Sequence, residues 1–209
     1  TPYLKSNGSQ KVVLAVEDAT NFSSQPRGKQ QINASGIYYT PVSGIWQTVW
    51  LEAVSSESYL KQVKTTTDID KSTVSIIPMT NVSLVKRYKV AVNIFFDEKK
   101  VASGITNPNT QLNLKINNAQ LWSPEHPHLY DVKMDLINPS GKIIDEVKSY
   151  FGMRKISLAD HKGVKYLFLN NVPLFHYGPL DQGWWPDGLL TPPSDKAMRY
   201  DIEMTKAMG

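Results

Sequence analysis

The side chains best suited to binding chemistry gather in residues 176–193, a stretch with four prolines, three glycines and two tryptophans but no periodic pattern. This composition predicts a loop. The loop contains Asp181, Gln182, Trp184 and Trp185. Indole rings stack on the apolar C–H faces of sugars, and carboxylate and amide groups form hydrogen bonds with sugar hydroxyls. We therefore expect these four side chains to contact a carbohydrate.

Asp181 and Asp187 are the only loop carboxylates that stand beside aromatic residues. Retaining hydrolysis of a glycoside needs two carboxyl groups about 5–5.5 Å apart, one with a raised pKa and one ionised. The spacing of Asp181 and Asp187 could bring them together. Aspartates in Pro/Gly loops more often cap a backbone turn, however. We favour turn capping and assign no catalytic residue.

Other reactive constellations are weak or absent in the sequence. Cysteine is missing, which excludes disulfides, thiolate metal sites and cysteine nucleophiles. His126 and His128 have a spacing that could bind a metal from a strand, but Pro124 and Pro127 surround them and no third ligand is in sight. We interpret them as a structural turn. The sequence also lacks a phosphate-binding Gly-rich loop, a Gly-x-Ser-x-Gly elbow and a His-Glu-x-x-His motif. We predict no metal and no cofactor.

The composition indicates a folded chain of 209 residues with 41% hydrophobic residues, 20% charged residues and a net charge of +4. Basic residues never run longer than two, so we expect no nucleic-acid partner. Apolar runs fall short of a membrane span. The N-terminus shows neither an initiator Met nor a signal pattern, so any targeting segment was removed or lay upstream. We favour a periplasmic or secreted location and leave homo-oligomer formation open.

The middle of the chain predicts a mainly β fold, because short apolar segments alternate with turn residues at even spacing. In residues 87–96, apolar side chains occupy alternate positions, which indicates a strand with one buried face. Six such strands are typical of an immunoglobulin-like β-sandwich. The predicted strands are residues 59–66, 72–80, 87–96, 111–116, 130–137 and 142–151.

The segments on either side look like parts of other domains. Residues 11–17 predict a buried strand, and residues 45–54 predict a second one with Trp46 and Trp50 packed in its core. Further on, Asn170-Asn171 between two apolar runs predicts a hairpin, since Asn tolerates the positive φ of a tight turn.

Ser194 is placed to cap a helix whose apolar residues lie on two flanks, which predicts packing on more than one side. A single strand–helix unit cannot close a parallel sheet, so we expect the chain to stop inside a domain.

Several motifs then carry a family resemblance: residues 25–30, 38–52, 121–130, 151–156 and 169–174. They resemble segments of glycoside hydrolase family 2, the β-galactosidases, β-mannosidases and β-glucuronidases. The resemblance implies three units. Residues 1–54 would be the C-terminal part of a sugar-binding jelly roll, residues 55–157 the immunoglobulin-like β-sandwich, and residues 158–209 the first β-hairpin and βα unit of the catalytic (β/α)8 barrel.

The resemblance also implies the function. The catalytic glutamates of the family lie on later barrel strands, and only Glu203 follows Leu169 here, on the predicted helix. We therefore interpret the chain as a central fragment of a retaining β-glycoside hydrolase of carbohydrate metabolism. The fragment alone would be inactive, and its partner would be the carbohydrate substrate of the full-length enzyme.

A β-galactoside is the commonest substrate in the family. Residues 176–188 depart from the arginine-histidine-glutamate cluster of many relatives, which leaves the sugar open. The alternative function is a self-sufficient, non-catalytic carbohydrate-binding or adhesive β-sandwich module.

Overall fold

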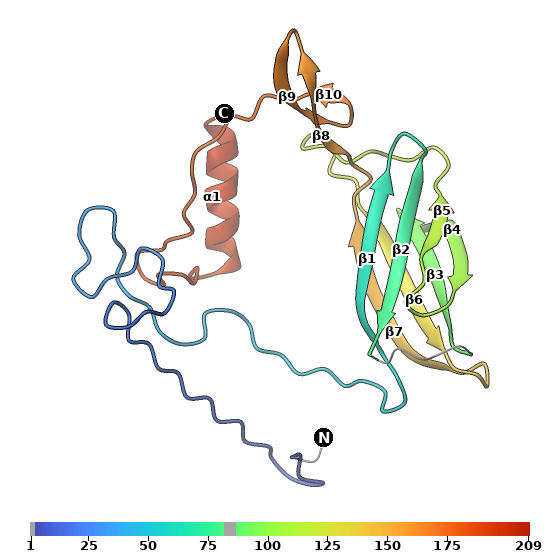
Figure 1. Ribbon diagram of the computed structural model, residues 1–209, viewed down its shortest axis with the longest axis horizontal. Helices are drawn as coiled ribbons and strands as arrows, with labels where there is room; N and C mark the ends of the chain where they lie inside the picture. Colours follow the sequence, from blue (N-terminus) through green and yellow to red (C-terminus); the bar gives the residue numbers. More distant parts are fainter. Residues whose placement is uncertain (1–2, 82–86) are drawn as a thin grey trace. The chain divides into compact units, whose positions relative to one another are not determined.

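The computed structural model describes residues 3–81 and 87–209 (Figure 1). The described residues are mainly β: they form three antiparallel sheets and one helix. The contacts divide the chain into two compact units. One unit joins the chain up to Leu51 with Tyr177–Gly209, and the other is Glu52–His176. All three sheets belong to the second unit.

Two of the sheets pack together. The first has the order β1-β2-β5 and consists of β1 (Leu60–Asp68), β2 (Thr73–Thr80) and β5 (Leu112–Lys115). The second has the order β4-β3-β6-β7 and consists of β4 (Lys99–Thr106), β3 (Lys89–Phe96), β6 (Tyr130–Ile137) and β7 (Ile143–Phe151). All six strands predicted for this region are present.

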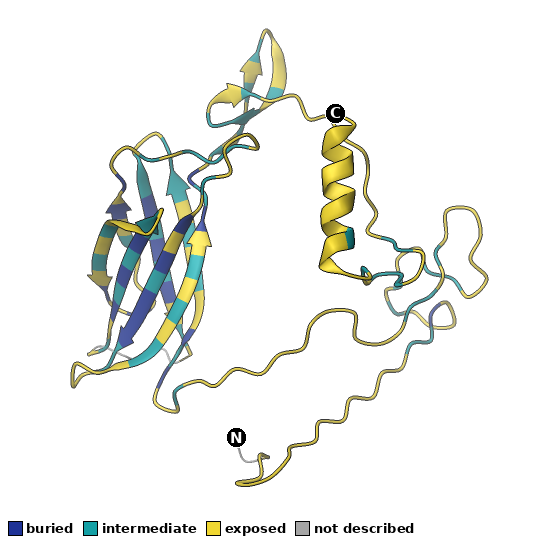
Figure 2. Cartoon of the chain, turned by 180° about the vertical axis from the view of Figure 1, so that it is seen from behind, coloured by how far each residue is buried: buried dark blue, intermediate teal, exposed yellow. Residues whose placement is uncertain are grey.

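Buried side chains from both sheets form one hydrophobic core. On β3, Val90, Val92 and Ile94 are fully buried, and Ala91 and Asn93 between them are not, so the predicted alternation is confirmed. Figure 2 shows the buried residues concentrated on these two sheets. Each fully buried Val, Ile or Leu contributes about 1.5–3 kcal/mol, whereas an exposed ion pair contributes about 0–1 kcal/mol. The core therefore holds the two sheets together.

A third, smaller sheet follows directly after β7. It has the order β10-β9-β8 and consists of β8 (Ile156–His161), β9 (Val164–Leu169) and β10 (Val172–Pro173). Asn170 and Asn171 form the turn between β9 and β10, with φ angles of 51° and 65°. The predicted hairpin is confirmed, and Asn occupies the two positions that need a left-handed backbone.

The helix α1 (Asp195–Ala207) begins where the sequence predicts. The Ser194 hydroxyl accepts a 3.1 Å hydrogen bond from the Ala197 amide, and Asp195 lies in the first turn, where the helix dipole favours an anion. The predicted packing on more than one side is wrong, because α1 has no buried residue. Within the described part of the chain, no helix is long and apolar enough to cross a membrane.

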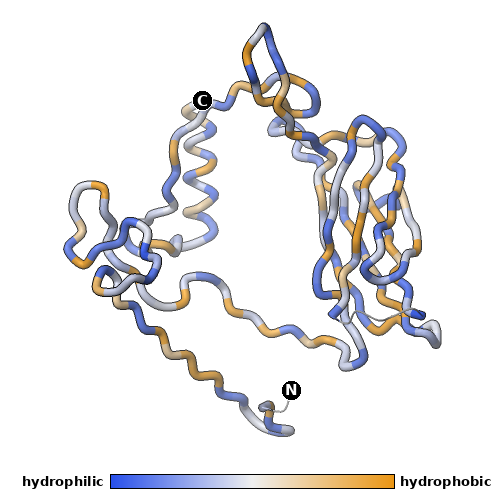
Figure 3. The backbone as a smooth tube through the Cα atoms, viewed as in Figure 1, coloured by the Kyte–Doolittle hydropathy of each residue, from blue (hydrophilic) through white to orange (hydrophobic). Residues whose placement is uncertain are grey.

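The two strands predicted in the N-terminal segment are also wrong. Residues 11–17 and 45–54 form no strand, and Trp46 and Trp50 are 54% and 71% exposed instead of packed in a core. Figure 3 shows the apolar run of residues 12–16 as a hydrophobic stretch of extended chain. A strand needs partners for its backbone groups, and among the described residues this region contains only the isolated bridge between Gln30 and Tyr39.

Candidate functional site

The predicted sugar-contacting loop belongs to the first unit, where its tryptophans meet the N-terminal segment. The ring of Trp184 stacks on the ring of Tyr39, with centroids 4.7 Å apart and an angle of 30° between the planes. Two backbone hydrogen bonds fix the position of Tyr39. Its amide donates to Lys29 O at 2.9 Å, and its carbonyl accepts from the Gln31 amide at 3.0 Å. The stack leaves Trp184 half-buried. An aromatic pair therefore joins segments that are far apart in sequence.

Two backbone hydrogen bonds between Trp185 and Leu189 close a turn within the loop. The amide of Trp185 donates to Leu189 O at 2.8 Å, and the amide of Leu189 donates back to Trp185 O at 3.0 Å. Gly188 lies inside this turn, and a Cβ atom at that position would stand 1.8 Å from the carbonyl oxygen of Thr191. Only glycine fits there without moving the backbone. The close approach fixes the chain that follows Trp185.

Asp181 caps a turn, as favoured over a catalytic role. Its carboxylate accepts a 2.7 Å hydrogen bond from the amide of Gly183, whose φ is 64°. Gln182 and Asp187 are exposed. The structure thus brings Trp184 onto Tyr39 and gives Asp181 a backbone partner, whereas carbohydrate contact by the four predicted residues stays a prediction.

A cavity of about 310 Å³ lies in the same unit. Its lining includes Asp18, Arg27, Ser43, Trp46 and Leu190. It therefore combines a carboxylate, a guanidinium, a hydroxyl and an indole, which are the groups that bind polar ligands with apolar faces.

Asp18 organises one wall of this cavity. One carboxylate oxygen accepts hydrogen bonds from the Thr20 amide, at 2.7 Å, and from the side-chain amide of Gln25. The other oxygen accepts from the Ser43 hydroxyl at 3.2 Å. The bond from the Thr20 amide is the main cause that lowers the pKa of Asp18 below its ordinary value, and the bonds from Ser43 and Gln25 act in the same direction. Asp18 is therefore ionised at neutral pH and suited to accepting hydrogen bonds rather than donating a proton.

The sequence offered one signal for this cavity that the prediction did not use. The apolar run of residues 12–16 is followed by two carboxylates, Glu17 and Asp18, and a carboxylate after an apolar run is a candidate binding residue. Arg27 stands in a Pro-Gly loop. Nothing in the sequence relates these residues to Leu190, which lies more than 160 positions away.

The His126–His128 segment forms a turn. The Ser123 amide donates to His126 O at 2.9 Å, and the His126 amide donates to Ser123 O at 3.1 Å. The two imidazole rings lie nearly parallel with centroids 5.9 Å apart, and His128 packs edge-on against Phe96. In residues 3–81 and 87–209, no group of three or more His, Asp or Glu side chains is arranged to hold a metal ion.

Comparison with known proteins gives consistent matches. Residues 58–154 match the model of the glycosyl hydrolases family 2. A putative β-glucuronidase of Formosa agariphila is 28% identical over 226 aligned residues, which cover 100% of this chain and 25% of that protein. A β-galactosidase of Thermoanaerobacter pseudethanolicus is 22% identical, with 83% of this chain and 23% of that protein covered.

Among solved structures, the β-glucuronidase from Ruminococcus gnavus in complex with D-glucuronic acid is similar in fold. The TM-score is 0.60 at 18% identity, over 72% of this chain and 24% of that chain. The chain thus spans about a quarter of the length of the curated relatives it matches.

Proposed function

We propose that the chain is the central part of a retaining β-glycosidase, on the premise that residues 58–154 match the glycosyl hydrolases family 2. One observation carries the proposal. The family match begins and ends within a few residues of the two packed sheets, which run from Leu60 at the start of β1 to Phe151 at the end of β7. All residues of the hydrophobic core lie within the segment that matches the family model.

In this proposal the two packed sheets are the immunoglobulin-like domain. Its strands A, B and E would be β1, β2 and β5, and strands C′, C, F and G would be β4, β3, β6 and β7. A second feature supports the assignment. Tyr130 stands at the start of β6, is buried, and its hydroxyl oxygen binds the backbone upstream, as the corner tyrosine of such sandwiches does.

The sandwich supplies architecture rather than acid–base chemistry. On its surface, Glu146 accepts a hydrogen bond from Lys133 at 2.8 Å, and this bond lowers the pKa of Glu146. Glu57 accepts a hydrogen bond from the Tyr88 hydroxyl at 2.5 Å. A general acid needs a raised pKa at working pH, and Glu146 has the opposite shift. In this proposal the two catalytic carboxylates lie on later barrel strands, as the resemblance to family 2 implies.

The first unit would contribute to sugar recognition. The Tyr39–Trp184 stack and the cavity beside Asp18 and Trp46 provide apolar faces next to hydrogen-bonding groups. Asp181, Gln182, Trp184 and Trp185 are the proposed substrate-contacting residues of the loop, and Asp18 and Arg27 join them. The relatives include a β-glucuronidase and a β-galactosidase, so both a β-glucuronide and a β-galactoside are substrate candidates.

The alternative, a self-sufficient carbohydrate-binding module, differs in what the 209-residue chain does alone. Titration with β-linked galacto- and glucuronosyl oligosaccharides, followed by tryptophan fluorescence, separates the two functions. The enzyme-part proposal predicts no saturable change, because the remaining walls of the sugar site are supplied elsewhere. Saturable binding at micromolar sugar that is lost in Trp184→Ala would favour the module. The Tyr200→Ala variant, on the exposed helix α1, is the matched control.

A further inference from the structure

The segment that links the sandwich to the third sheet, residues 152–155, is bound to its surroundings at every position. A Cβ atom on Gly152 would lie 3.1 Å from Trp122, so the indole covers the glycine directly. Met153 is fully buried, and its carbonyl accepts a 2.9 Å hydrogen bond from the Trp122 amide. A linker fixed in this way is not a hinge.

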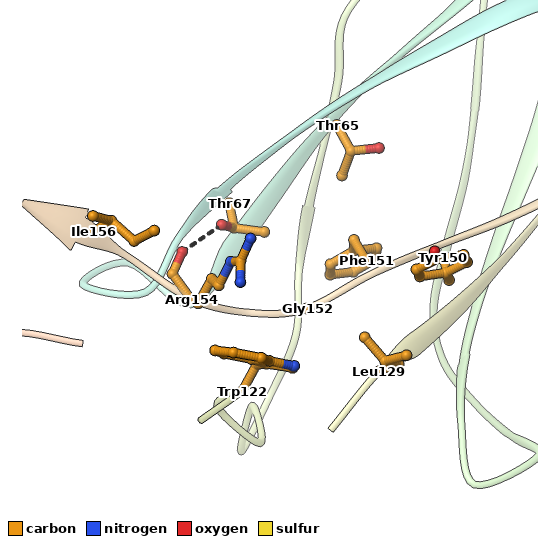
Figure 4. Close-up of a pocket in the computed structure, with 9 residues that line it drawn as sticks. All are labelled: Thr65, Thr67, Trp122, Leu129, Tyr150, Phe151, Gly152, Arg154 and Ile156. Atoms are coloured by element: carbon orange, nitrogen blue, oxygen red, sulfur yellow. Dashed lines mark hydrogen bonds between the residues drawn. The ribbon is translucent and has the colours of Figure 1, made fainter. Parts of the chain in front are cut away.

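Both the side chain and the backbone of Arg154 contact neighbouring residues. Its guanidinium lies over the Trp122 ring, 4.7 Å from the ring centre, and its carbonyl accepts a 2.8 Å hydrogen bond from the Thr67 hydroxyl on β1. Figure 4 shows the Thr67–Arg154 bond and the arginine side chain above Trp122, in the wall of a groove of about 520 Å³.

Lys155 continues the same pattern through Asp70, in the turn between β1 and β2. One carboxylate oxygen of Asp70 lies 2.6 Å from the Lys155 ammonium nitrogen, and the other accepts a 2.7 Å hydrogen bond from the Asn171 side-chain amide. The two oxygens thus bind two different parts of the chain: Lys155 at the end of the linker, directly before β8, and Asn171 in the β9–β10 turn.

Asn170 completes the arrangement with three hydrogen bonds. Its side-chain oxygen accepts from the Lys155 amide at 3.0 Å, and its own amide donates to Lys155 O at 2.8 Å. Its side-chain nitrogen donates to Trp122 O at 2.9 Å. Both asparagines of the turn therefore have a second role besides their left-handed backbone, which a glycine could also adopt.

We propose that Asp70, Lys155, Asn170 and Asn171 form a positioning clamp that fixes the orientation of the β8–β10 sheet on the sandwich. The side chains of Lys155 and Asp70 are 37% and 52% exposed, and ion pairs of this kind add little to overall stability. The clamp instead fixes the orientation of the β8–β10 sheet relative to the sandwich. A carboxylate with two oxygens bound at short distance admits one relative placement of its partners. The clamp does not depend on which glycoside the full-length protein acts on.

Paired spin labels test the clamp in the whole 209-residue chain. The sequence has no cysteine, so Lys64→Cys on β1 together with Val164→Cys on β9 gives two unique labelling sites on exposed residues. Double electron–electron resonance then measures the distance between sandwich and sheet. With the clamp intact, we expect one narrow distribution of the distance between the two spin labels.

Two variants remove the clamp by different routes. Asp70→Ala deletes the carboxylate, and Asn171→Gly deletes the amide while keeping a residue that accepts φ of 65°. Both are expected to broaden the distribution at least about twofold and to leave the thermal midpoint of the sandwich within about 2 °C, because the core is untouched. Lys155→Met should act likewise, and Lys155→Arg, which keeps the ion pair, should restore the narrow distribution.

The matched control is Asp160→Ala. It breaks an exposed ion pair with Lys165 at 2.8 Å that lies wholly within the β8–β9 hairpin, and it should leave the distance distribution narrow. A narrow, unshifted distribution in both Asp70→Ala and Asn171→Gly would overturn the proposal. Broadening in Asp160→Ala equal to that in Asp70→Ala would also overturn it, because the effect would then not belong to the clamp.

Discussion

The hydroxyl oxygen of Tyr130 accepts a 2.6 Å hydrogen bond from the backbone amide of Gln120. Tyr130 is 1% exposed and stacks on Phe151, with ring centroids 5.2 Å apart. Burial raises the pKa of its phenol, so the hydroxyl is neutral over the physiological range. One side chain therefore fills the core between the sheets and also fixes the segment that leads into β6.

Removing that hydroxyl should cost measurable stability. In Tyr130→Phe the ring is kept and the hydrogen bond from the Gln120 amide is lost, which should cost about 0.5–1.5 kcal/mol, the net contribution of a typical hydrogen bond. Urea unfolding followed by circular dichroism measures the difference. Tyr150→Phe, at a residue that is 68% exposed, serves as the control and should change stability by less than about 0.5 kcal/mol. Equal effects of the two substitutions would show that the Tyr130–Gln120 bond contributes nothing special.

Gly188→Ala should disorder the tryptophan loop without unfolding the sandwich. The added methyl group would meet the Thr191 carbonyl, so the turn between Trp185 and Leu189 must open and the Trp184–Tyr39 stack should be lost. Near-ultraviolet circular dichroism reports the loss of the stack, and the far-ultraviolet signal reports the sheets. Gly178→Ala is the matched control, because a Cβ atom there meets nothing within 4 Å. A near-ultraviolet spectrum that is the same in both variants would contradict the steric argument.

Acid should release the wall of the cavity that Asp18 organises. The folded-state pKa of Asp18 is lowered below its ordinary value of 3.8, chiefly by the Thr20 amide bond. Its stabilising effect is therefore complete above pH 3.8 and is lost as the pH falls through the lower, folded-state pKa. The Thr20 amide resonance in a pH titration by nuclear magnetic resonance should follow this loss, with a midpoint below 3.8.

Asp18→Asn is the control for that titration, because it keeps the shape of the side chain and removes the charge. It should abolish the acid-dependent movement of the Thr20 amide resonance. A midpoint at or above 3.8 in the unaltered protein would mean that the hydrogen bonds to Asp18 do not favour its ionised form.

Among the described strands of the two packed sheets, β4 alone could not be predicted from apolar segments that alternate with turn residues. β6 lies where the sequence predicts it, because every second residue is large and apolar. β4 escaped prediction because its inward positions are Ala102, Gly104 and Thr106. A Cβ atom on Gly104 would lie 3.0 Å from Leu114, so the bulk of the opposite sheet fills the space that a large side chain on β4 would need. Such compensation across two sheets is not visible in a local pattern.

The terminal segments show the opposite error. Residues 11–17 and 45–54 have strong strand propensity, yet they form no strand here, because propensity does not supply the neighbouring strand that satisfies backbone groups. The turn-capping role of Asp181 was predicted correctly. The turn-capping role of Asp181 is visible from its Pro/Gly surroundings, whereas the meeting of Trp184 with Tyr39 depends on chain segments 145 positions apart.

We propose that this chain holds the architecture of a β-glycosidase and not its catalytic carboxylates. The most direct measurement is the release of 4-nitrophenol from 4-nitrophenyl β-D-glucuronide and β-D-galactoside by the purified 209-residue chain. A chain extended by a complete barrel of typical size, about 250 residues, is assayed in parallel. The account predicts no turnover above the uncatalysed rate for the 209-residue chain and turnover of at least one substrate by the extended one. Turnover by the 209-residue chain itself, unchanged after further purification, would contradict it.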